Sequence, residues 1–352
     1  MNTTMSHLLR HSLVLSAAVV LLAGCAEKAP LAPEEISPAA ADLNGGKASV
    51  PGPARLLVTG LQGASGSTIG PGGALFVTEG AVGRISRVDP ETGAVTTLAS
   101  GLPPSIIGIG GAYDVAFLGN TAYALVTLVG PDVGGSDVVG IYRIDGPDSF
   151  SVIADIGAYN LANPPNTPFF VPTGVQYSFE AWRGAFLVAD GHHNRVLHVT
   201  RDGNITELRT FGNVVPTGLA TSGNTIFMAE AGPIPHLPED GRLISFSPNS
   251  SRVSDVASGG RLLVDVEFGR GRTLFALSQG VWDEVAEGSP ALPNTGALLR
   301  VNGDGTFVVV SDALDRPTSL EFIGNTAYVV TLTGEIWTIA NAARPPFGQQ
   351  SQ

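Results

Sequence analysis

The sequence predicts an all-β protein, a six-bladed β-propeller with four antiparallel strands in each blade. Three observations carry this prediction. A short apolar phrase returns six times at a mean spacing of roughly 50 residues, a second alternating phrase follows each copy, and a tight turn follows five of these. The 352 residues include 45 glycines and 25 prolines, which suits a chain that turns often and contains no long helical pattern.

The first repeated phrase predicts the second strand of each blade. Every copy contains an aromatic residue among small and β-branched ones, a composition that favours strands. The copies occupy residues 73–79, 120–126, 184–190, 224–230, 272–278 and 325–331.

The second phrase alternates polar and apolar residues, as a strand with one buried face does, and predicts the third strand. Its copies begin at Arg84, Gly140, Arg195, Arg242, Ala297 and Glu335. Five copies run into glycine-, asparagine- or proline-containing turns suited to hairpins, and an apolar fourth phrase follows, as in residues 94–98 and 204–208. Each repeat therefore predicts one four-stranded blade.

Closure of the ring gives a separate check on the number of blades. The sixth repeat, which starts at Arg316, supplies only three strands and lacks a clear hairpin after Ile339. Residues 54–61 resemble residues 95–102, the fourth phrase of the first repeat. We therefore expect the N-terminal strand to complete the last blade and to protect its open edge. The alternative is an open stack of sheets.

Composition and charge limit the partners that the chain can bind. Hydrophobic residues make up 43% of the chain, which is enough for one large core. The formal net charge of −12 disfavours binding to phosphates, so nucleic acid is not an expected partner. The acidity fits solubility, or a site for cations or neutral ligands.

The N-terminal region predicts an exported lipoprotein. Arg10 precedes an apolar run over residues 12–22, too short for a permanent membrane span, and the run ends in Leu-Ala-Gly-Cys at residues 22–25. This ending resembles a bacterial lipobox, and Cys25 is the chain's one cysteine. We expect a signal peptide over residues 1–24, lipid on Cys25 and an Ala/Pro-rich tether over residues 25–53. The propeller would follow over residues 54–343 and a disordered tail over residues 344–352.

Several blade phrases carry a resemblance to known families. The phrase at residues 187–196 resembles that of NHL-type propellers, and residues 92–95, 111–117 and 154–164 resemble the ScyD/ScyE family. The likeness extends over roughly residues 55–340 and is weakest in the sixth repeat. Because members of this family have no settled activity, the resemblance implies the fold and an exported location rather than a reaction. With the lipobox-like ending at Cys25, we expect a lipid-anchored protein of the bacterial cell envelope that faces the periplasm or the exterior.

Acidic residues recur at two positions of the repeat. Inner-strand starts align as Ser67, Asp114, Gly174, Gly218, Asp265 and Ser319, and second-strand ends as Glu79, Val126, Asp190, Glu230, Ser278 and Thr331. If the five acids converge on one mouth, they suit Ca²⁺ or another divalent cation, which takes oxygen ligands. Lactonase-type propellers use a comparable acid-bound metal to polarise the substrate. The alternative is that each acid caps a strand end in its own loop.

Loop residues supply weaker candidates for binding. They are the adjacent histidines and phenylalanines of blade 3 and a tryptophan in a long insertion of blade 5, namely His192, His193, Phe169, Phe170 and Trp282. Apolar loop residues at a propeller mouth can contact ligands or partners, although a solvated histidine pair and simple packing under the loop are the alternatives.

Two functional classes remain open from the sequence. The chain contains no metalloprotease helix motif, nucleophile elbow, paired cysteine motif or phosphate-binding loop. One class is a propeller that binds a small molecule or a protein partner at a channel mouth without catalysis. The other is a metal-dependent, lactonase-like hydrolase that uses the clustered acids. The presence of a bound metal would separate them.

Overall fold

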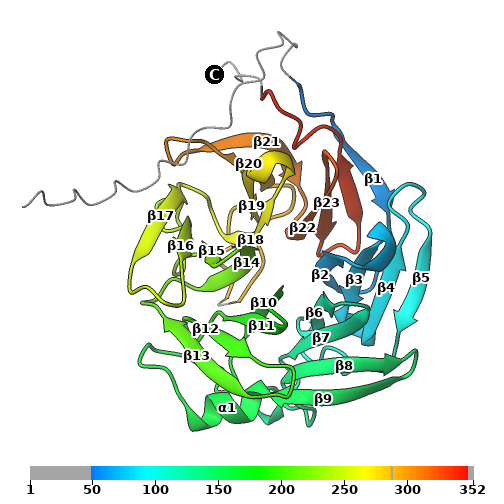
Figure 1. Ribbon diagram of the computed structural model, residues 1–352, viewed down its shortest axis with the longest axis vertical. Helices are drawn as coiled ribbons and strands as arrows, with labels where there is room; N and C mark the ends of the chain where they lie inside the picture. The colour runs from blue at the N-terminus through cyan, green and yellow to red at the C-terminus, as the bar shows by residue number, and fades with distance from the viewer. Residues whose placement is uncertain (1–48, 287, 348–352) are drawn as a thin grey trace, which may run out of the picture. The chain divides into compact units, whose positions relative to one another are not determined.

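The computed structural model describes residues 49–286 and 288–347, and in them the chain forms six four-stranded antiparallel sheets arranged in a ring (Figure 1). The prediction of a six-bladed β-propeller is confirmed. The predicted signal peptide, Cys25 and all but the last residues of the predicted tether lie outside the described residues.

Each blade follows the order of the repeated phrases, from the inner strand outwards. Blade 1 contains β2 (Ala64–Ile69), β3 (Leu75–Glu79), β4 (Arg84–Val88) and β5 (Val95–Ala99), and blade 2 contains β6 (Gly111–Leu118), β7 (Thr121–Thr127), β8 (Gly140–Gly146) and β9 (Ser149–Asp155). Blade 3 contains β10 (Gln176–Trp182), β11 (Ala185–Asp190), β12 (Arg195–Val199) and β13 (Ile205–Thr210), and blade 4 contains β14 (Pro216–Ser222), β15 (Thr225–Glu230), β16 (Arg242–Phe246) and β17 (Val253–Ser258). Blade 5 contains β18 (Leu263–Phe268), β19 (Leu274–Ser278), β20 (Gly296–Val301) and β21 (Phe307–Leu314), and blade 6 contains β22 (Pro317–Ile323), β23 (Thr326–Thr331), β24 (Ile336–Ile339) and β1 (Ala54–Val58).

Blade 6 is completed by the N-terminal strand, as the sequence predicts. Strand β1 pairs antiparallel with β24, with Ala54 opposite Ile339 and Val58 opposite Ile336. Val58 and Leu61 are buried in an apolar cluster that joins blade 6 to blade 1. The two ends of the described chain therefore close the ring through one shared sheet.

The core lies between neighbouring blades. The second strands are buried on both faces, so they are apolar almost throughout: all six residues of β11 are buried. Phe186 of this strand packs its ring 4.8 Å from that of Tyr123 in blade 2 and 5.3 Å from that of Phe179 in its own blade. Such contacts between blades explain why one repeat could not bury its apolar faces alone.

Packing of the propeller extends beyond the predicted boundary at residue 343. Ser49 forms an isolated bridge with Phe347, whose ring lies 4.3 Å from the guanidinium carbon of Arg300 and packs against Phe275. Phe347 therefore packs against blade 5, whereas Arg344, Pro345 and Pro346 before it are exposed.

The short helices occur in the connections. They are α1 (Ile156–Ala162) between blades 2 and 3 and four 3-10 turns, η1 (Pro71–Gly73), η2 (Gly80–Val82), η3 (Pro131–Val133) and η4 (Arg270–Arg272). In the part of the chain that the structure describes, no helix has the length and apolar character to cross a membrane.

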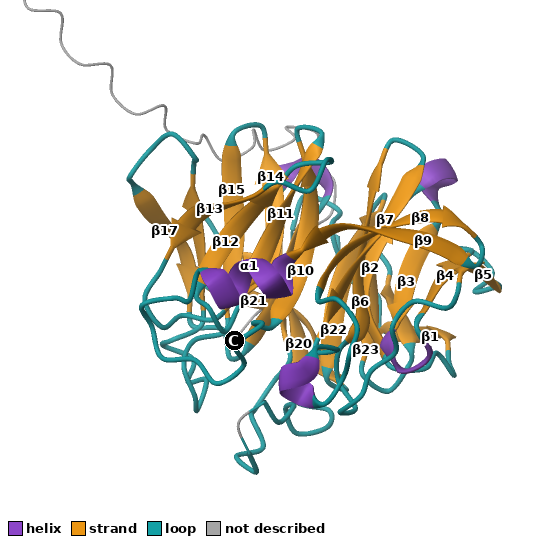
Figure 2. Cartoon of the chain, turned by 90° about the horizontal axis from the view of Figure 1, so that it is seen from below, coloured by secondary structure: helices purple, strands orange, loops and turns teal. Residues whose placement is uncertain are grey.

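The six inner strands surround a central channel. They are β2, β6, β10, β14, β18 and β22. Each is the first strand of its blade along the chain except in blade 6, where β1 comes earlier in the chain and lies at the outer edge. Seen edge-on in Figure 2, the strands form the body of the ring and the loops gather at its two faces. One of these faces carries the loops that precede the inner strands and those that follow the second strands. We call this face the mouth face.

Candidate functional site

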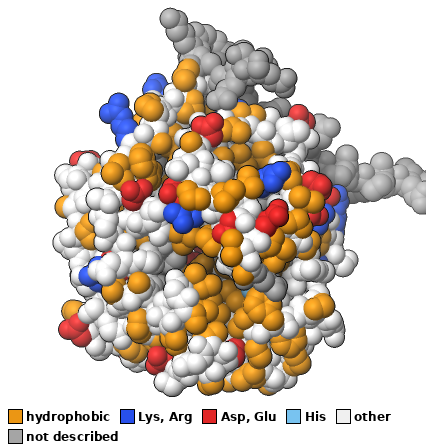
Figure 3. Space-filling model, turned by 180° about the vertical axis from the view of Figure 1, so that it is seen from behind, with side chains coloured by type: hydrophobic (Ala, Val, Ile, Leu, Met, Phe, Trp, Pro, Cys, Tyr) orange, Lys and Arg blue, Asp and Glu red, His pale blue; other side chains and the backbone are white. Residues whose placement is uncertain are grey.

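A cavity of about 850 Å³ occupies the central channel and is lined by inner strands from all six blades and by loops of the mouth face. Figure 3 shows a face of the ring on which hydrophobic side chains border a central hollow. The cavity brings together residues that are far apart in the sequence, so it is the site where the repeats can act jointly.

Two levels of polar side chains project into the cavity from the inner strands. At the upper level Ser178, Asp265 and Ser319 lie at the same register, each opposite the next-to-last residue of the neighbouring second strand. Two residues further on, and hence on the same strand face, blades 3, 5 and 6 each carry a glutamate. These lower residues are Glu180, Glu267 and Glu321, and all three line the cavity.

Asp114 and Asp265 make the same contacts in the opposite blades 2 and 5. Each carboxylate accepts a hydrogen bond of 2.8 Å from the next backbone N–H in its own strand. Asp114 also accepts from the N–H of Phe179 at 2.9 Å, and Asp265 from that of Leu320 at 2.7 Å. Because Phe179 and Leu320 belong to the following blades, both acids tie neighbouring inner strands together while facing the cavity.

The inner strand of the preceding blade has a glycine beside each of these two acids, because a side chain would not fit at that position. A Cβ atom on Gly66 would lie 2.7 Å from the Asp114 Cα, and one on Gly218 would lie 2.5 Å from the Asp265 Cα. The glycines therefore allow the backbones of blades 1 and 4 to approach the aspartates of blades 2 and 5 closely, so each carboxylate packs against the neighbouring inner strand.

Burial in the channel favours the neutral form of its carboxyl groups. It raises the pKa of Glu180 and that of Asp265 to about 7. Burial, reinforced by repulsion from neighbouring carboxylates, raises the pKa of Asp114, Glu267 and Glu321 well above the ordinary range. No lysine or arginine lines the cavity within residues 49–286 and 288–347, so no fixed positive charge opposes this effect.

The other three predicted acids lie elsewhere and are paired with arginines. Each ends a second strand and faces, across the ladder, an arginine that begins the third strand of the same blade. The pairs are Glu79 with Arg84, Asp190 with Arg195, and Glu230 with Arg242. Of the five predicted acids, only Asp114 and Asp265 line the cavity, and each of the other three is held by an arginine of its own blade. Among the described side chains, no three of His, Cys, Asp and Glu are grouped so that they could hold a metal ion.

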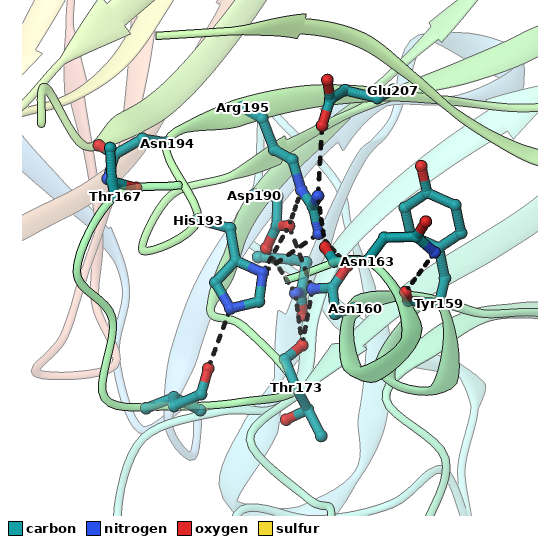
Figure 4. A network of polar contacts seen from close by, with 12 residues as sticks. Tyr159, Asn160, Asn163, Thr167, Thr173, Asp190, His193, Asn194, Arg195 and Glu207 are labelled. Carbon is teal, nitrogen blue, oxygen red and sulfur yellow. Dashed lines mark hydrogen bonds and ion pairs between the residues drawn. The ribbon is translucent and has the colours of Figure 1, made fainter. Parts of the chain in front are cut away.

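Asp190 and Arg195 form the centre of a buried polar network in blade 3 (Figure 4). The Arg195 Nε donates to Asp190 Oδ2 at 2.9 Å, and its two terminal nitrogens donate to Asn160 Oδ1 and to the carbonyl of Asn163. Helix α1 supplies Asn160, whose Nδ2 also donates to Asp190 at 3.1 Å. These donors occupy the Asp190 carboxylate, which explains its position without a bound metal.

His193 belongs to the same network rather than to the cavity. Its side chain is fully buried, and because arginine can only donate, its Nδ1 accepts from Arg195 at 3.2 Å. The opposite ring nitrogen, Nε2, then donates to the carbonyl of Val171 at 3.1 Å. Phe169 packs edge-on against this imidazole, with 5.0 Å between the ring centroids.

The acid–arginine pairs differ in how far the arginine offsets the rise in pKa that burial of the acid causes. Burial raises the pKa of Glu79, but hydrogen bonds from Arg84, Ser86 and the N–H of Gln62 outweigh it, so the pKa lies below its ordinary value. For Glu230 burial dominates over the attraction of Arg242 and raises the pKa to about 7. The Arg242 Nε lies 3.2 Å from Glu230 Oε2 without forming a hydrogen bond.

Aromatic side chains form part of the cavity wall on the mouth face. The ring of His192 lies 4.7 Å from that of Phe170 and 5.8 Å from that of Tyr177, and its Nε2 shares a hydrogen bond of 2.9 Å with the Tyr177 hydroxyl. Burial lowers the pKa of His192 to about 4, so this imidazole is neutral at physiological pH. Phe169 also lines the cavity. Trp282 does not, but it packs edge-on against His236, which does.

The repeat pattern alone did not reveal the three lower glutamates. It placed the inner-strand start of blade 3 at Gly174, whereas the register places Ser178 at the position of Asp265. The shift of four residues hid the alignment of Glu180 with Glu267 and Glu321. Because side chains two residues apart in a strand lie on the same face, Asp265 and Ser319 could have indicated that Glu267 and Glu321 also face the channel.

Comparisons with known proteins agree with the architecture. No family model and no curated protein matches the sequence. Among solved structures, a gluconolactonase from Xanthomonas campestris is similar with 12% identity and a TM-score of 0.58 over 84% of this chain and 95% of that one. A PQQ-bound aldose sugar dehydrogenase from Streptomyces coelicolor has 15% identity and a TM-score of 0.55 over 83% and 99%. An inactive virginiamycin B lyase variant from Staphylococcus aureus with quinupristin has 14% identity and a TM-score of 0.53 over 82% and 98%. At these identities the likeness establishes the fold alone.

Proposed function

We propose that this propeller binds a small organic ligand in its central cavity. The observation that carries the proposal is the cavity itself: its volume of about 850 Å³ lies within the usual range of ligand pockets, and its lining combines an aromatic wall with a few convergent polar groups. Phe169 and Phe170 are 38% and 53% exposed, so large apolar side chains are available to a ligand at the mouth face.

The proposed cellular setting is that of a lipid-anchored envelope protein of the ScyD/ScyE type, attached through Cys25 and facing the periplasm or the exterior. One feature of the fold supports this arrangement. Ala54, at the start of β1, pairs with the last residue of β24, Ile339, and third strands end on the face opposite the mouth face. The tether would therefore leave the ring on that opposite face, and the mouth would stay open to the aqueous space.

Cys25→Ala is expected to abolish lipid attachment and to release the protein from the membrane fraction or leave it unprocessed. The physical reason is that the tether and the acidic propeller supply no other firm anchor. Fractionation of cells that carry the wild type and the variant measures this. A correctly processed Cys25→Ala protein that stays in the membrane pellet would contradict the anchoring proposal.

Ligand binding can be tested with N-phenyl-1-naphthylamine, an uncharged aromatic probe whose fluorescence rises in apolar surroundings. We expect saturable binding of one probe per protein, weakened about tenfold by Phe170→Ala because a half-exposed ring of the cavity wall is lost. Leu161→Ala is the matched control, since Leu161 is 61% exposed on α1 and does not line the cavity. Absence of saturable binding, or equal losses in both variants, would refute the proposal.

A lactonase-like hydrolase that uses Ca²⁺ or another divalent cation is the second candidate, favoured by the carboxyl groups that line the channel. Hydrolysis of glucono-δ-lactone with calcium and with a chelator separates the two candidates. A metal-dependent rate that Asp265→Asn removes would support the hydrolase. A rate equal to the uncatalysed one under both conditions would leave ligand binding, whether of a small molecule or of a segment of a protein partner, as the function.

A further inference from the structure

We propose that the cavity selects organic cations, with a protonated amine held by the channel carboxyl groups and an apolar body held by the aromatic wall. The inference rests on the proposed binding of a small ligand and names its chemical class. It is carried by the shape of the cavity, by the sign of the charge in its lining and by the nature of the groups on its wall.

Charge pairing distinguishes the channel acids from the other buried acids. Glu79, Asp190 and Glu230 each lie beside an arginine of their own blade. Within the described residues, no ion pair involves any of the five channel acids, which are Asp114, Glu180, Asp265, Glu267 and Glu321. Asp114 is buried, and the other four are half-buried along the cavity wall. Carboxylates that are largely withdrawn from water are normally paired, so the cavity has a place for a positive charge that the chain itself does not fill.

The placement of these acids suits an extended organic cation better than a single metal ion. They come from blades 2, 3, 5 and 6 and lie on two levels of the channel. No three acidic or imidazole side chains of the described chain are close enough together to surround one ion. An ammonium group with several N–H donors can instead bind acceptors that are spread over the walls.

The cavity wall beside these acids suits the apolar body of such a ligand. His192 and Ser178 line the cavity, while the His192 Nδ1 and Ser178 Oγ atoms are themselves enclosed by the protein without a hydrogen-bond partner in the described part of the chain. The rings of Phe170 and Tyr177 beside His192 provide the apolar and cation–π contacts that an amine-bearing ligand uses.

Cation binding in this cavity is linked to protons. Burial raises the pKa of Glu180 and Asp265 to about 7 and that of the other three channel acids well above its ordinary value, so these groups are partly protonated near neutral pH. A bound cation favours their ionised form, so binding releases protons and strengthens as pH rises. The other titratable groups that face the cavity are Tyr113, Asp132, Tyr177, His192 and His236. Of these, both imidazoles have pKa values lowered by burial, and His192, with a pKa of about 4, stays neutral over the range in question.

The experiment uses three probes that share one skeleton and differ in charge: 2-phenylethylamine, 2-phenylethanol and phenylacetate. Each is titrated calorimetrically into the wild-type propeller between pH 6 and pH 8. We expect the amine to bind at least about tenfold more tightly than the alcohol, the acetate not to bind, and the amine's affinity to rise about tenfold over this range. Titrations in buffers of different ionisation enthalpy should show proton release with the amine alone.

Glu267→Gln and Glu321→Gln should each reduce the preference for the amine over the alcohol and the number of protons released. Glu91→Gln is the matched control, because Glu91 is exposed in the turn between β4 and β5. Equal binding of amine and alcohol at every pH would overturn cation selection while leaving ligand binding intact. If neither these probes nor the uncharged fluorescent probe binds, the proposed function itself fails.

Discussion

Arg195→Met is expected to lower the melting temperature of the protein by at least about 6 °C. The side chain of Arg195 is 1% exposed and that of Asp190 is fully buried, so the substitution leaves a carboxylate without its cation inside the protein. Breaking a buried pair from one side costs about 3–5 kcal/mol, and the freed acceptors of Asn160 and His193 add to the loss. Thermal unfolding followed by circular dichroism measures the effect.

Arg84→Met is the matched control because it removes the equivalent arginine from blade 1. The Arg84 side chain is 31% exposed, and Glu79 keeps its hydrogen bonds from Ser86 and from the N–H of Gln62. A smaller loss of stability is expected there. The loss in Arg195→Met should also be the same with calcium and with chelator, since Asn160 and Gln176 still donate to Asp190 in the variant. Equal losses in the two variants, or a loss that appears only with calcium, would contradict the buried network as the cause.

The sequence contains a signal for these pairs at two positions of the repeat. The second-strand phrase ends in an acid in blades 1, 3 and 4, and the third-strand phrase begins with arginine in the same blades. Because the two positions face each other across the ladder, as Asp190 and Arg195 do, the joint recurrence predicts an ion pair rather than a metal site. The recurring acid at the end of the second strand, taken without the recurring arginine, is equally compatible with a metal site.

The fold was predictable because a propeller repeats its pattern, and a prediction made for one blade is checked by the others. The segments in which the blades differ were harder to predict from the sequence. The insertion before β10 contains α1, which no helical periodicity in the sequence predicts. Asp155 caps this helix by accepting a hydrogen bond from the N–H of Ala158. This insertion displaced the alignment of blade 3 and concealed Glu180.

The position of the cavity acids in space could not be derived from the repeats alone. Glu180, Glu267 and Glu321 come from three strands that are not neighbours in the sequence, and only the closed ring with its register brings them to one level of the channel. Their raised pKa values follow from that burial and not from any local motif. The local sequence thus predicts which side chains face inwards, and the closure determines what they face.

Deletion of residues 54–61 is expected to abolish the cooperative unfolding transition at any temperature above about 25 °C. The deletion removes β1, so β24 loses its ladder partner and becomes an open edge at the seam of the ring.

Val58 and Leu61, which are 5% and 7% exposed, leave the cluster between blades 6 and 1, and the burial of two such side chains stabilises a fold by about 3–6 kcal/mol. Together with the lost ladder, this approaches the whole free energy of unfolding of a typical domain, about 5–15 kcal/mol. The matched control is deletion of residues 26–48, which precede the described packing of the ring and should leave the melting temperature unchanged. A shortened protein without residues 54–61 that melts as the wild type does would show that the other strands close the ring unaided, and it would remove the N-terminal strand from the account of stability.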